Sequence, residues 1–436
     1  MSANLIWEAA ETLPVEKMRE LQLTRLKECV KRAMNVEFYR ETFAERGITP
    51  DSIRSLEDIR QLPFTVKDDL RRNYPFGMLA VPKSELIRIH ASSGTTGKPT
   101  FCGYTRSDLD TWANLCARFL VAGGLRREHI AQVSFGYGLF TGGFGLHYGI
   151  EKVGTAVIPV SSGNTARQVL MLRDAEADAL ICTPSYALNL AEALAEAGLK
   201  PGSLNLKMAF LGGEAWTESM RHAIEEALGI NVYNNYGLSE VLGPGVSGEC
   251  IYHSGMHIQE DHFFVECIDP DTGEELPDGE QGELVITALT REAMPIIRYR
   301  TRDLATLDRS LCPCGRTTMR MGRVYGRTDD MMIVRGVNVF PSQIEEALLK
   351  AGGTAPHYLI ELTRPKSTDR AVVKIEIRPE DFSDRMTEMQ ALKQRIDREI
   401  NAMTGLRFEI ELLPPNTLER SLGKAKRVND LRNLKD

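Results

Sequence analysis

Hydrophobic positions recur along the chain with two different periods, and these periods separate its regions. In residues 1–60 apolar side chains such as Leu23, Leu26 and Val30 recur at helical spacing, which predicts helices. Between about 85 and 240, short apolar runs alternate with amphipathic segments, and this alternation predicts a parallel sheet covered by helices. The strands expected there are 131–134, 155–159, 179–182 and 208–211, and the helices are 165–174, 186–197 and 217–228.

The rest of the chain carries two further patterns. Residues 263–268 and 282–288 flank a turn-rich segment and predict an antiparallel pair. Nearer the end, alternating apolar positions at 373–377 and 406–412 predict strands around an amphipathic helix that Gly405 ends. We therefore expect an α/β fold. A large N-terminal domain with mixed or parallel sheets, residues 1–328, would be joined by a hinge to a small α+β C-terminal domain, residues 329–436.

Composition excludes several classes of protein. With 436 residues, 42% hydrophobic and 26% charged, the chain has the balance of a soluble globular protein. Its net charge of −7 argues against a nucleic-acid partner or an anionic membrane surface. No apolar run reaches the roughly 18 residues of a membrane helix, and the first residues lack an export signal. We expect a cytoplasmic protein, and its eight cysteines do not form a secreted disulfide framework.

Residues 92–100, SSGTTGKPT, form the most informative motif. Its hydroxyls and backbone N–H groups can surround a polyphosphate, because Gly94 and Gly97 remove steric bulk. Lys98 adds a positive charge. The two glycines are too close together for a Walker A loop. On composition alone, a polar linker is the alternative interpretation.

This string resembles the phosphate-binding signature of the adenylate-forming superfamily of acyl-CoA synthetases, adenylation domains and luciferases. Four later segments resemble the family's motifs in the same order, at 212–214, 236–240, 299–303 and 326–330. The resemblance implies ATP and Mg²⁺. The nucleotide contacts that it implies are Ser92, Ser93, Gly94, Thr95, Thr96, Gly97, Lys98, Gly213, Glu214, Asn235, Tyr236, Gly237, Ser239, Asp303 and Arg327.

The same resemblance implies individual roles. Ser239 would bond the α-phosphate, Glu240 would hold Mg²⁺ as a hard carboxylate ligand, and Asp303 would bind both ribose hydroxyls. Residues 326–330, GRTDD, resemble the hinge between the domains. There Asp329 would be the pivot, while Arg327 would contact the nucleotide.

A basic segment, RSLGKAKR at 420–427, lies near the end of the chain. A solvated basic tail is the ordinary interpretation, but the family places its catalytic lysine after a glycine here. Lys424 is the best match, and Lys426 is the second choice. A carboxylate must attack an anionic phosphate, so an ammonium that bridges the two groups stabilises the transition state. The resemblance further implies a hinge rotation before coenzyme A attacks, with Gly336 and Asn338 facing the thiol.

Residues 136–149, GYGLFTGGFGLHYG, and 335–346, RGVNVFPSQIEE, are similar to the phenylacetate–coenzyme A ligase branch of this superfamily. The similarity covers essentially the whole chain. It implies that ATP, phenylacetate and coenzyme A become phenylacetyl-CoA, AMP and diphosphate through an acyl-adenylate. The acid pocket would be lined by Phe135, Phe140, Gly213 and Pro244. Aromatic walls beside glycines suit a flat ring, although a tight core turn has the same composition.

Several alternatives stay open on these residues. The acid could be indoleacetate or a benzoate-type acid, and the acceptor could be a non-CoA group such as a deazaflavin. A non-catalytic adenylate-binding protein is disfavoured because Glu240, Asp303, Arg327 and Lys424 are all present. A homodimer is expected only from the relatives.

Cys312 and Cys314 enclose a single proline and resemble a metal knuckle. With Cys250 and His257 they would complete a structural Zn²⁺ site of three thiolates and one imidazole. The choice of His257 over His253 rests on the resemblance, and a chance pair of cysteines is the alternative.

Overall fold

The computed structural model describes residues 5–92, 99–364, 369–382, 385–420 and 425–432. The chain divides into two compact units. Unit 1 comprises Met1–Cys182, Leu204–Gly213 and Ile230–Arg323, and unit 2 comprises Thr183–Ser203, Glu214–Gly229 and Val324–Asp436. The expected division between residues 328 and 329 stays a prediction, since unit 2 also takes in two earlier segments of the chain.

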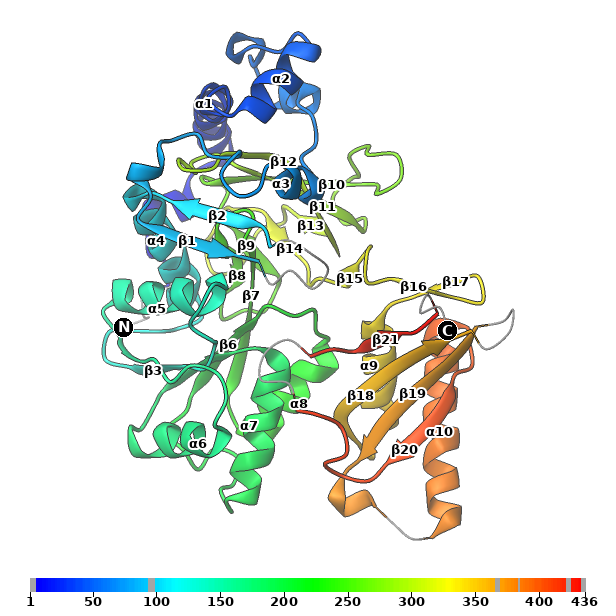
Figure 1. Ribbon diagram of the computed structural model, residues 1–436. Coiled ribbons are helices and arrows are strands. Elements are labelled where there is room, and N and C mark those ends of the chain that lie inside the picture. Colours follow the sequence, from blue (N-terminus) through cyan, green and yellow to red (C-terminus); the bar gives the residue numbers. More distant parts are fainter. Residues whose placement is uncertain (1–4, 93–98, 365–368, 383–384, 421–424, 433–436) are drawn as a thin grey trace. The chain divides into compact units, whose positions relative to one another are not determined.

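Within the described residues, the main sheet of unit 1 has nine strands in the order β13-β14-β9-β8-β7-β6-β5-β3-β4. Strands β6, β7, β8 and β9 are labelled in Figure 1. Neighbours from β4 to β7 are parallel, whereas those from β7 to β13 are antiparallel. The strands are β3 (Ile130–Val133), β4 (Ala156–Ile158), β5 (Ala179–Cys182), β6 (Met208–Gly212), β7 (Asn231–Leu238), β8 (Gly243–Glu249), β9 (Met256–Ile258), β13 (Leu307–Asp308) and β14 (Arg320–Met321). The fold is therefore α/β with a mixed sheet, as expected.

The central strands form where the sequence is continuously apolar. Every residue of β5 and β6 is buried, which is typical of parallel strands covered on both faces. The four strands expected from these runs are present as β3, β4, β5 and β6, within two residues at each end. The antiparallel half was not predicted, because its strands carry many glycines and polar residues.

Two smaller sheets complete unit 1. A hairpin pairs β1 (Arg88–Ala91) with β2 (Phe101–Tyr104). A second, antiparallel sheet contains β10 (Phe263–Ile268), β11 (Gly282–Ala288) and β12 (Ile296–Ala305). The expected bounds of β10 and β11 are confirmed.

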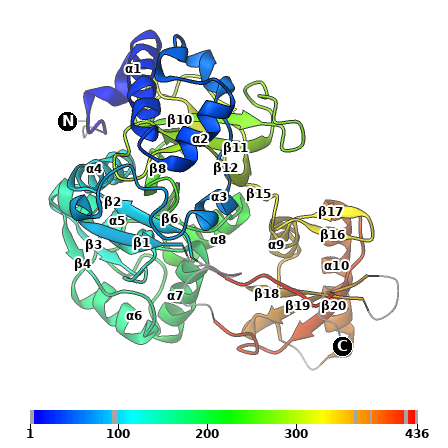
Figure 2. The ribbon, with the colours of Figure 1, turned by 45° about the horizontal axis from the view of Figure 1, so that its top comes forward.

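The helices predicted in residues 1–60 are present as α1 and α2, which are visible together in Figure 2. On α1 the side chains of Leu26, Val30 and Ala33 are fully buried, as their helical spacing indicated. The helices are α1 (Val15–Ala33), α2 (Glu37–Glu45), α3 (Lys67–Arg72), α4 (Arg106–Ala122), α5 (Thr141–Val153) and α6 (Thr165–Asp174). Short 3₁₀ turns lie at Ala9–Thr12, Pro50–Ser52, Leu56–Gln61 and Lys83–Glu85.

Unit 2 contains a four-stranded sheet in the order β20-β19-β18-β21, with α9 and α10 on one face (Figure 2). Its elements are α7 (Pro184–Glu196), α8 (Glu218–Leu228), β15 (Gly326–Arg327), β16 (Met332–Val334), β17 (Val337–Val339), α9 (Pro341–Ala351), β18 (Thr354–Thr363), β19 (Arg370–Ile377), a 3₁₀ turn (Pro379–Asp381), α10 (Met386–Thr404), β20 (Glu409–Leu413) and β21 (Val428–Asp430). The predicted strand–helix–strand pattern is present as β19, α10 and β20. Gly405 ends α10 with a φ of 71°, a left-handed conformation that glycine adopts without strain.

Threonine side chains cap the N-termini of α7 and α8. The Thr183 hydroxyl accepts a hydrogen bond from the Tyr186 N–H at 3.3 Å, and Pro184 supplies a preset φ at the first turn. The Thr217 hydroxyl caps α8 in the same way, accepting from the Met220 N–H at 3.2 Å. These caps fix where both helices begin.

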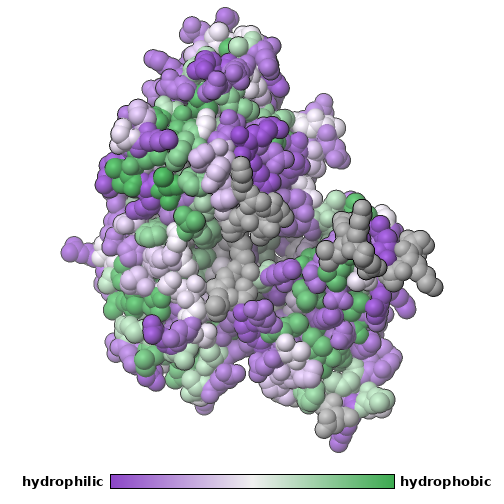
Figure 3. All heavy atoms as spheres, viewed as in Figure 1, coloured by the Kyte–Doolittle hydropathy of each residue, from purple (hydrophilic) through white to green (hydrophobic). Residues whose placement is uncertain are grey.

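Within the described residues, none of the helices has the length and apolarity that a bilayer span requires. On the face drawn in Figure 3, hydrophilic and hydrophobic residues are interspersed.

The packing of α5 on α4 leads to a stability prediction. A Cβ at Gly149 would lie 2.4 Å from the Cys116 Cβ and 3.2 Å from the Cys116 backbone carbon. Gly149→Ala should therefore lower the free energy of unfolding by about 1–3 kcal/mol, because backbone cannot move aside cheaply. Urea denaturation measures this. Gly138→Ala is the control, since a Cβ there meets nothing within 4 Å, and an equal loss in both variants would contradict the prediction.

Candidate functional site

The predicted phosphate loop connects the two strands of the β1–β2 hairpin. At its base the Ser92 N–H donates to the Thr100 carbonyl at 3.0 Å, and the Thr100 N–H donates to the Ser92 Oγ at 3.2 Å. These bonds hold the two ends of the loop together. The other predicted phosphate contacts, from Ser93 to Lys98, lie outside the described residues.

Two motifs that are far apart in the sequence meet at the end of β7. The Tyr236 hydroxyl donates to the Asp303 Oδ2 at 2.6 Å, which joins β7 to β12. The Asp303 N–H donates to the Thr301 hydroxyl at 3.0 Å, and the Asp303 side chain is largely buried. The Tyr236 hydroxyl thus fixes the orientation of the Asp303 carboxylate.

The adenine strip predicted at 212–214 lies beside β7. Asn235 Nδ2 donates to the Leu211 carbonyl at 2.8 Å, and a Cβ at Gly212 would lie 2.5 Å from the Asn235 carbonyl oxygen. Gly213 has a φ of 84°, in the left-handed region that favours glycine. These contacts keep the β6 and β7 ends close together. The nucleotide-binding roles of Gly213 and Asn235 stay predictions.

Ser239 and Glu240 lie in the turn between β7 and β8. The Ser239 hydroxyl is 2.9 Å from that of Thr141, at the start of α5. The buried Glu240 carboxylate has the Lys67 ammonium at 3.5 Å from its Oε1. The ion pair with Lys67 lowers the cost of keeping a charged carboxylate in a buried place.

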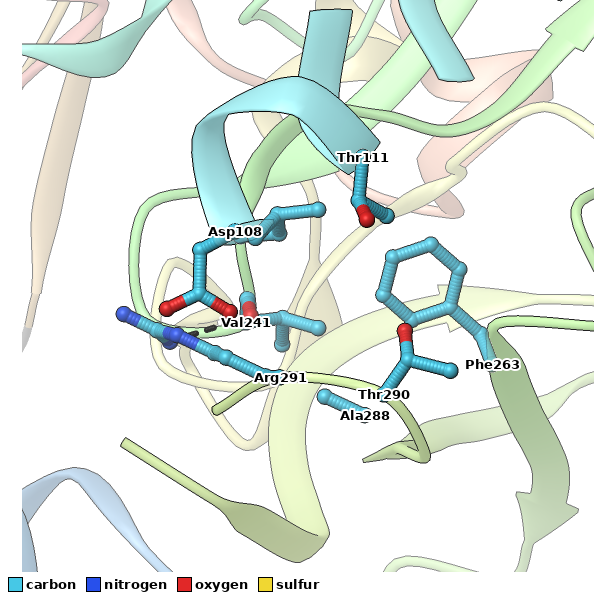
Figure 4. A pocket seen from close by; sticks show the side chains of 8 residues that line it. Asp108, Thr111, Val241, Phe263, Ala288, Thr290 and Arg291 are labelled. Atoms are coloured by element: carbon cyan, nitrogen blue, oxygen red, sulfur yellow. Dashed lines mark hydrogen bonds between the residues drawn. The ribbon is translucent and has the colours of Figure 1, made fainter. Parts of the chain in front are cut away.

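Buried side chains donate hydrogen bonds to the backbone carbonyls of the turn between β7 and β8. The guanidinium of the buried Arg291 donates to the carbonyls of Glu240 and Val241, the second at 3.0 Å, and Figure 4 shows it pointing to the Val241 backbone. The Tyr104 hydroxyl donates to the Leu242 carbonyl at 2.8 Å. The orientation of Ser239 and Glu240 is therefore set by buried donors from two other elements.

Three of the predicted acid-pocket residues, Phe135, Phe140 and Pro244, lie against the first turns of α5. A Cβ at Gly142 would lie 2.7 Å from the Phe140 ring and 3.5 Å from the Phe135 ring. One helical turn further, a Cβ at Gly145 would lie 2.7 Å from the Pro244 Cγ. The two rings and the proline thus pack against α5 at positions that are glycines. That Gly213 lines the same pocket stays a prediction.

In unit 2, Arg327 and Asp329 of the predicted hinge pair with each other. Arg327 Nε donates to the Asp329 Oδ1 at 2.8 Å, and Nη2 donates to Oδ2 at 3.1 Å, in a bidentate arrangement. Gly336 has a φ of 81° in the turn between β16 and β17, and Asn338 lies on β17. Lys426 is exposed, whereas Lys424, the predicted catalytic lysine, lies outside the described residues.

Glu214 also belongs to unit 2. Its Oε2 accepts hydrogen bonds from the Ser185 N–H at 3.1 Å and from the Ser185 hydroxyl at 2.7 Å. Its Oε1 accepts from the Ala425 N–H at 2.7 Å. Its contact with adenine stays a prediction.

The four predicted zinc ligands come together in unit 1. The ligand atoms of Cys250, His257, Cys312 and Cys314 all lie within 4.8 Å of one another. The sulfurs of Cys250 and Cys312 are 3.7 Å apart, and the Cys314 sulfur is 3.3 Å from the His257 Nε2. Around a tetrahedral zinc ion with Zn–S bonds near 2.3 Å, sulfurs lie about 3.8 Å apart. The donor set and its spacing fit zinc.

The environment of the cluster supports this assignment. The hydrogen bond between the two thiols lowers the pKa of Cys314 and, together with burial, raises the pKa of Cys250. His257 Nδ1 lies 3.3 Å from the Thr318 hydroxyl, so that its Nε2 faces the sulfurs. His253, the open alternative, instead stacks on Tyr233 with ring centroids 4.9 Å apart. His257 is the histidine of this cluster.

Comparisons with known proteins show the family to which the chain belongs. Residues 53–289 match the family model of the AMP-binding enzymes, and residues 336–432 match that of the AMP-binding enzyme C-terminal domain. The chain is 49% identical to the phenylacetate-coenzyme A ligase of Thermus thermophilus, over 97% of this chain and 98% of that one. It is 46% identical to that of Escherichia coli K12, over 100% of this chain and 99% of that one. The chain belongs to the phenylacetate–coenzyme A ligase family.

A solved structure extends the comparison to the fold of this ligase-family chain. A 2-hydroxyisobutyryl-CoA ligase in its postadenylation state, in complex with 2-HIB-AMP, superposes with a TM-score of 0.93. The two are 30% identical, over 99% of this chain and 93% of that chain. The fold is that of the adenylate-forming ligases, as the sequence predicted.

Sequence reasoning missed three residues at the site of this ligase-family member. Lys67, Thr141 and Arg291 contact Glu240 or Ser239, yet the sequence analysis gave none of them a role. Lys67 and Arg291 stand in charged stretches that are ordinarily solvated. Thr141 lies within the glycine-rich stretch 136–149, which was interpreted only through its aromatic residues and glycines.

Proposed function

We propose that this chain ligates phenylacetate to coenzyme A in an AMP-forming reaction that passes through phenylacetyl-adenylate. The observation that carries the proposal is the near-complete match to four phenylacetate-coenzyme A ligases at 46–49% identity. The contacts that gather Tyr236, Ser239, Glu240 and Asp303 at the end of β7 support it.

On the nucleotide side, Asp303 binds the two ribose hydroxyls, and the Tyr236 hydroxyl orients its carboxylate. Ser239 bonds the α-phosphate, and its neighbour Thr141 fixes the direction of the hydroxyl. The family resemblance assigns the β- and γ-phosphates to the hydroxyl-rich loop at 92–98.

Glu240 is the residue that would hold Mg²⁺. Its buried carboxylate offers the hard oxygen ligand that this cation prefers, and Lys67 shows that the place already accommodates a positive charge. When bound, the ion would reduce the negative charge on the phosphates. Lys67 would then be free to balance the carboxylate of the acid or the α-phosphate.

The acid is proposed to lie between Phe135, Phe140 and Pro244, beside the glycines of α5. Flat apolar walls next to bare backbone suit an aromatic ring, which buries apolar area without a polar partner. The Trp112 indole N–H donates to the Pro244 carbonyl at 2.7 Å and holds this wall in place.

The chemistry joins two anions. The acid carboxylate attacks the α-phosphorus, diphosphate leaves, and the acyl-adenylate forms. The thiol of coenzyme A then attacks the acyl carbonyl, and AMP leaves with the electrons of the broken mixed-anhydride bond. Lys424 is proposed to stabilise the first of these steps. Residues 1–328 and 329–436 act as the two domains, with Asp329 as the pivot between the steps and Gly336 and Asn338 near the thiol.

The reaction can be tested with a panel of aryl acids. Release of diphosphate and formation of AMP and thioester should be greatest with phenylacetate, and the thioester should require coenzyme A. Indoleacetate and benzoate are the comparison acids. Diphosphate release that is unaffected by coenzyme A, with no thioester under any condition, would point to another acceptor.

Lys424→Ala separates the two half-reactions. Loss of the ammonium should lower ATP–diphosphate exchange by about 10²–10³-fold, since a preorganised charge is removed from the transition state. Thioester formation from chemically prepared phenylacetyl-adenylate and coenzyme A should change little. Lys426→Ala is the matched control. Equal losses in both half-reactions would show that the lysine is structural.

We further propose that Cys250, His257, Cys312 and Cys314 hold a structural zinc ion. Four protein ligands leave no open position, so the ion would not take part in the reaction. It would instead fasten the segment after β8 to the loop between β13 and β14, and so stabilise the fold.

Zinc content and melting temperature test this second proposal. The purified chain should contain one equivalent of zinc, and Cys312→Ser should lose both the metal and several degrees of Tm. Cys267→Ser is the control, because Cys267 is also buried but lies outside the cluster. Activity lost on chelation without any change in Tm would contradict a structural role.

A further inference from the structure

Glu240 is a buried carboxylate whose backbone is held in place. Its side chain is 8% exposed, and the buried Arg291 donates hydrogen bonds to the carbonyls of Glu240 and Val241. A charged group that has lost its hydration is costly unless a partner balances it. The charge of Glu240 therefore has to be balanced by a neighbouring group, because the carboxylate itself cannot turn to water.

The balancing charge comes from α3. Among the residues that the structure describes, the Lys67 ammonium is the cation that forms an ion pair with the Glu240 carboxylate, with 3.5 Å between Nζ and Oε1. Both residues belong to unit 1, although they are far apart along the chain. The pair is therefore a product of tertiary packing and joins α3 to the turn between β7 and β8.

The structure of α3 alone does not account for a lysine at this position. Lys67 is the first residue of the helix, where the helix dipole disfavours a positive charge. Asp68 pairs with Arg71 at 3.0 Å, and Asp69 accepts a hydrogen bond from the Val66 N–H at 2.8 Å. These acidic neighbours have partners of their own, and the Lys67 ammonium finds its partner outside the helix.

The two members of the pair differ in how readily they can leave it. The Lys67 side chain is 37% exposed, and an ammonium on a flexible four-carbon stem can turn to water at little cost. The distance of 3.5 Å is also longer than the roughly 2.7–2.9 Å of a strong charged hydrogen bond. The ammonium can therefore be released, whereas the buried carboxylate stays where it is.

A divalent cation bound by Glu240 would use the oxygens that the ammonium now faces. Mg²⁺ bonds to carboxylate oxygen at about 2.0–2.1 Å, which is closer than an ammonium comes. Two cations on one carboxylate repel each other, and the repulsion is strong where little water screens it. Binding of the metal ion by Glu240 therefore favours release of the Lys67 ammonium.

We propose that Lys67 is a positioning residue for Glu240: its ammonium keeps the carboxylate charged and in place, and it leaves when a divalent cation binds. The buried carboxylate then has a positive partner at every stage. The inference rests on the proposed function, because it takes Glu240 as the magnesium ligand. It adds that the ammonium and the metal ion compete. Removal of Lys67 should therefore strengthen metal binding, whereas the loss of a merely structural contact would weaken it or leave it unchanged.

Binding of Mn²⁺, a paramagnetic substitute for Mg²⁺, tests the inference on the purified full chain without nucleotide. The dissociation constant is read from the electron paramagnetic resonance signal of free Mn²⁺, at about pH 8, where carboxyl groups are ordinarily ionised. It should fall about fivefold in Lys67→Met, because the metal ion no longer has to displace the ammonium.

Arg72→Gln is the matched control. It removes an equal charge from the same helix, but the Arg72 side chain is 72% exposed and pairs with Asp69. At about 0.15 M salt a distant exposed charge is largely screened, so the dissociation constant should match that of the wild-type chain.

Glu240→Gln shows whether the effect passes through the carboxylate. In this background Lys67→Met should leave Mn²⁺ binding unchanged, since both substitutions remove parts of one interaction. The melting temperature supplies a second readout. At equal concentrations, Mn²⁺ should raise the Tm more in Lys67→Met than in the wild-type chain, because a ligand that binds more tightly stabilises the folded state more.

Mn²⁺ binding that is no tighter in Lys67→Met than in the wild-type chain would overturn the inference, whatever its absolute strength. A gain that persists in the Glu240→Gln background, or that Arg72→Gln shows equally, would do the same. Failure of the proposed function is recognised separately. The wild-type chain would then show no ATP–diphosphate exchange with any aryl acid, whereas the Mn²⁺ measurement requires no acid.

Discussion

The geometry of the site depends on how closely the chain passes itself where β7 turns back into β8. A Cβ at Gly237 would lie 2.1 Å from the Gly243 carbonyl oxygen, and a Cβ at Gly243 would lie 2.4 Å from the Trp112 ring. Only glycine fits at either place. Because the two strands approach so closely, Tyr236 can reach Asp303, while Ser239 and Glu240 are left in a short turn. Side chains of an ordinary size would separate the strands and disperse these groups.

The charges in unit 1 follow from the same packing. Glu240 and Asp303 are two buried carboxylates, and a buried charge is costly unless it has a partner. Lys67 brings an ammonium to Glu240, and Tyr236 brings a phenol hydroxyl to Asp303. ATP and a carboxylic acid would both bring more negative charge to such a place. The proposed reaction therefore requires cations, and Lys67 is one that the structure places beside Glu240. Mg²⁺ at Glu240 and the lysines predicted at 98 and 424 belong to the proposal.

Much of the fold could be predicted from local pattern, because burial on one or both faces leaves a period in the sequence. Helix α6 and strands β10 and β11 have the expected bounds, and Gly405 ends α10 where its position indicated. The strands that escaped prediction are of a different kind. In β21, Val428–Asp430, one apolar residue precedes two polar ones, and its strand conformation comes from pairing with β18 in register Ile360↔Val428. No window of sequence records a pairing partner that is 68 residues away.

The sequence by itself determined the family, the order of the motifs and the chemical type of each predicted ligand, since these depend on the identity and spacing of neighbouring residues. The tertiary structure decided which groups face one another. It brought His257 to the cysteines and stacked His253 on Tyr233, and it turned the Glu214 carboxylate toward Ser185 and Ala425. Such contacts join residues that are distant along the chain, and their geometry is set by packing. The family resemblance named His257 as the partner of the cysteines, but the sequence does not give the geometry of any of these contacts.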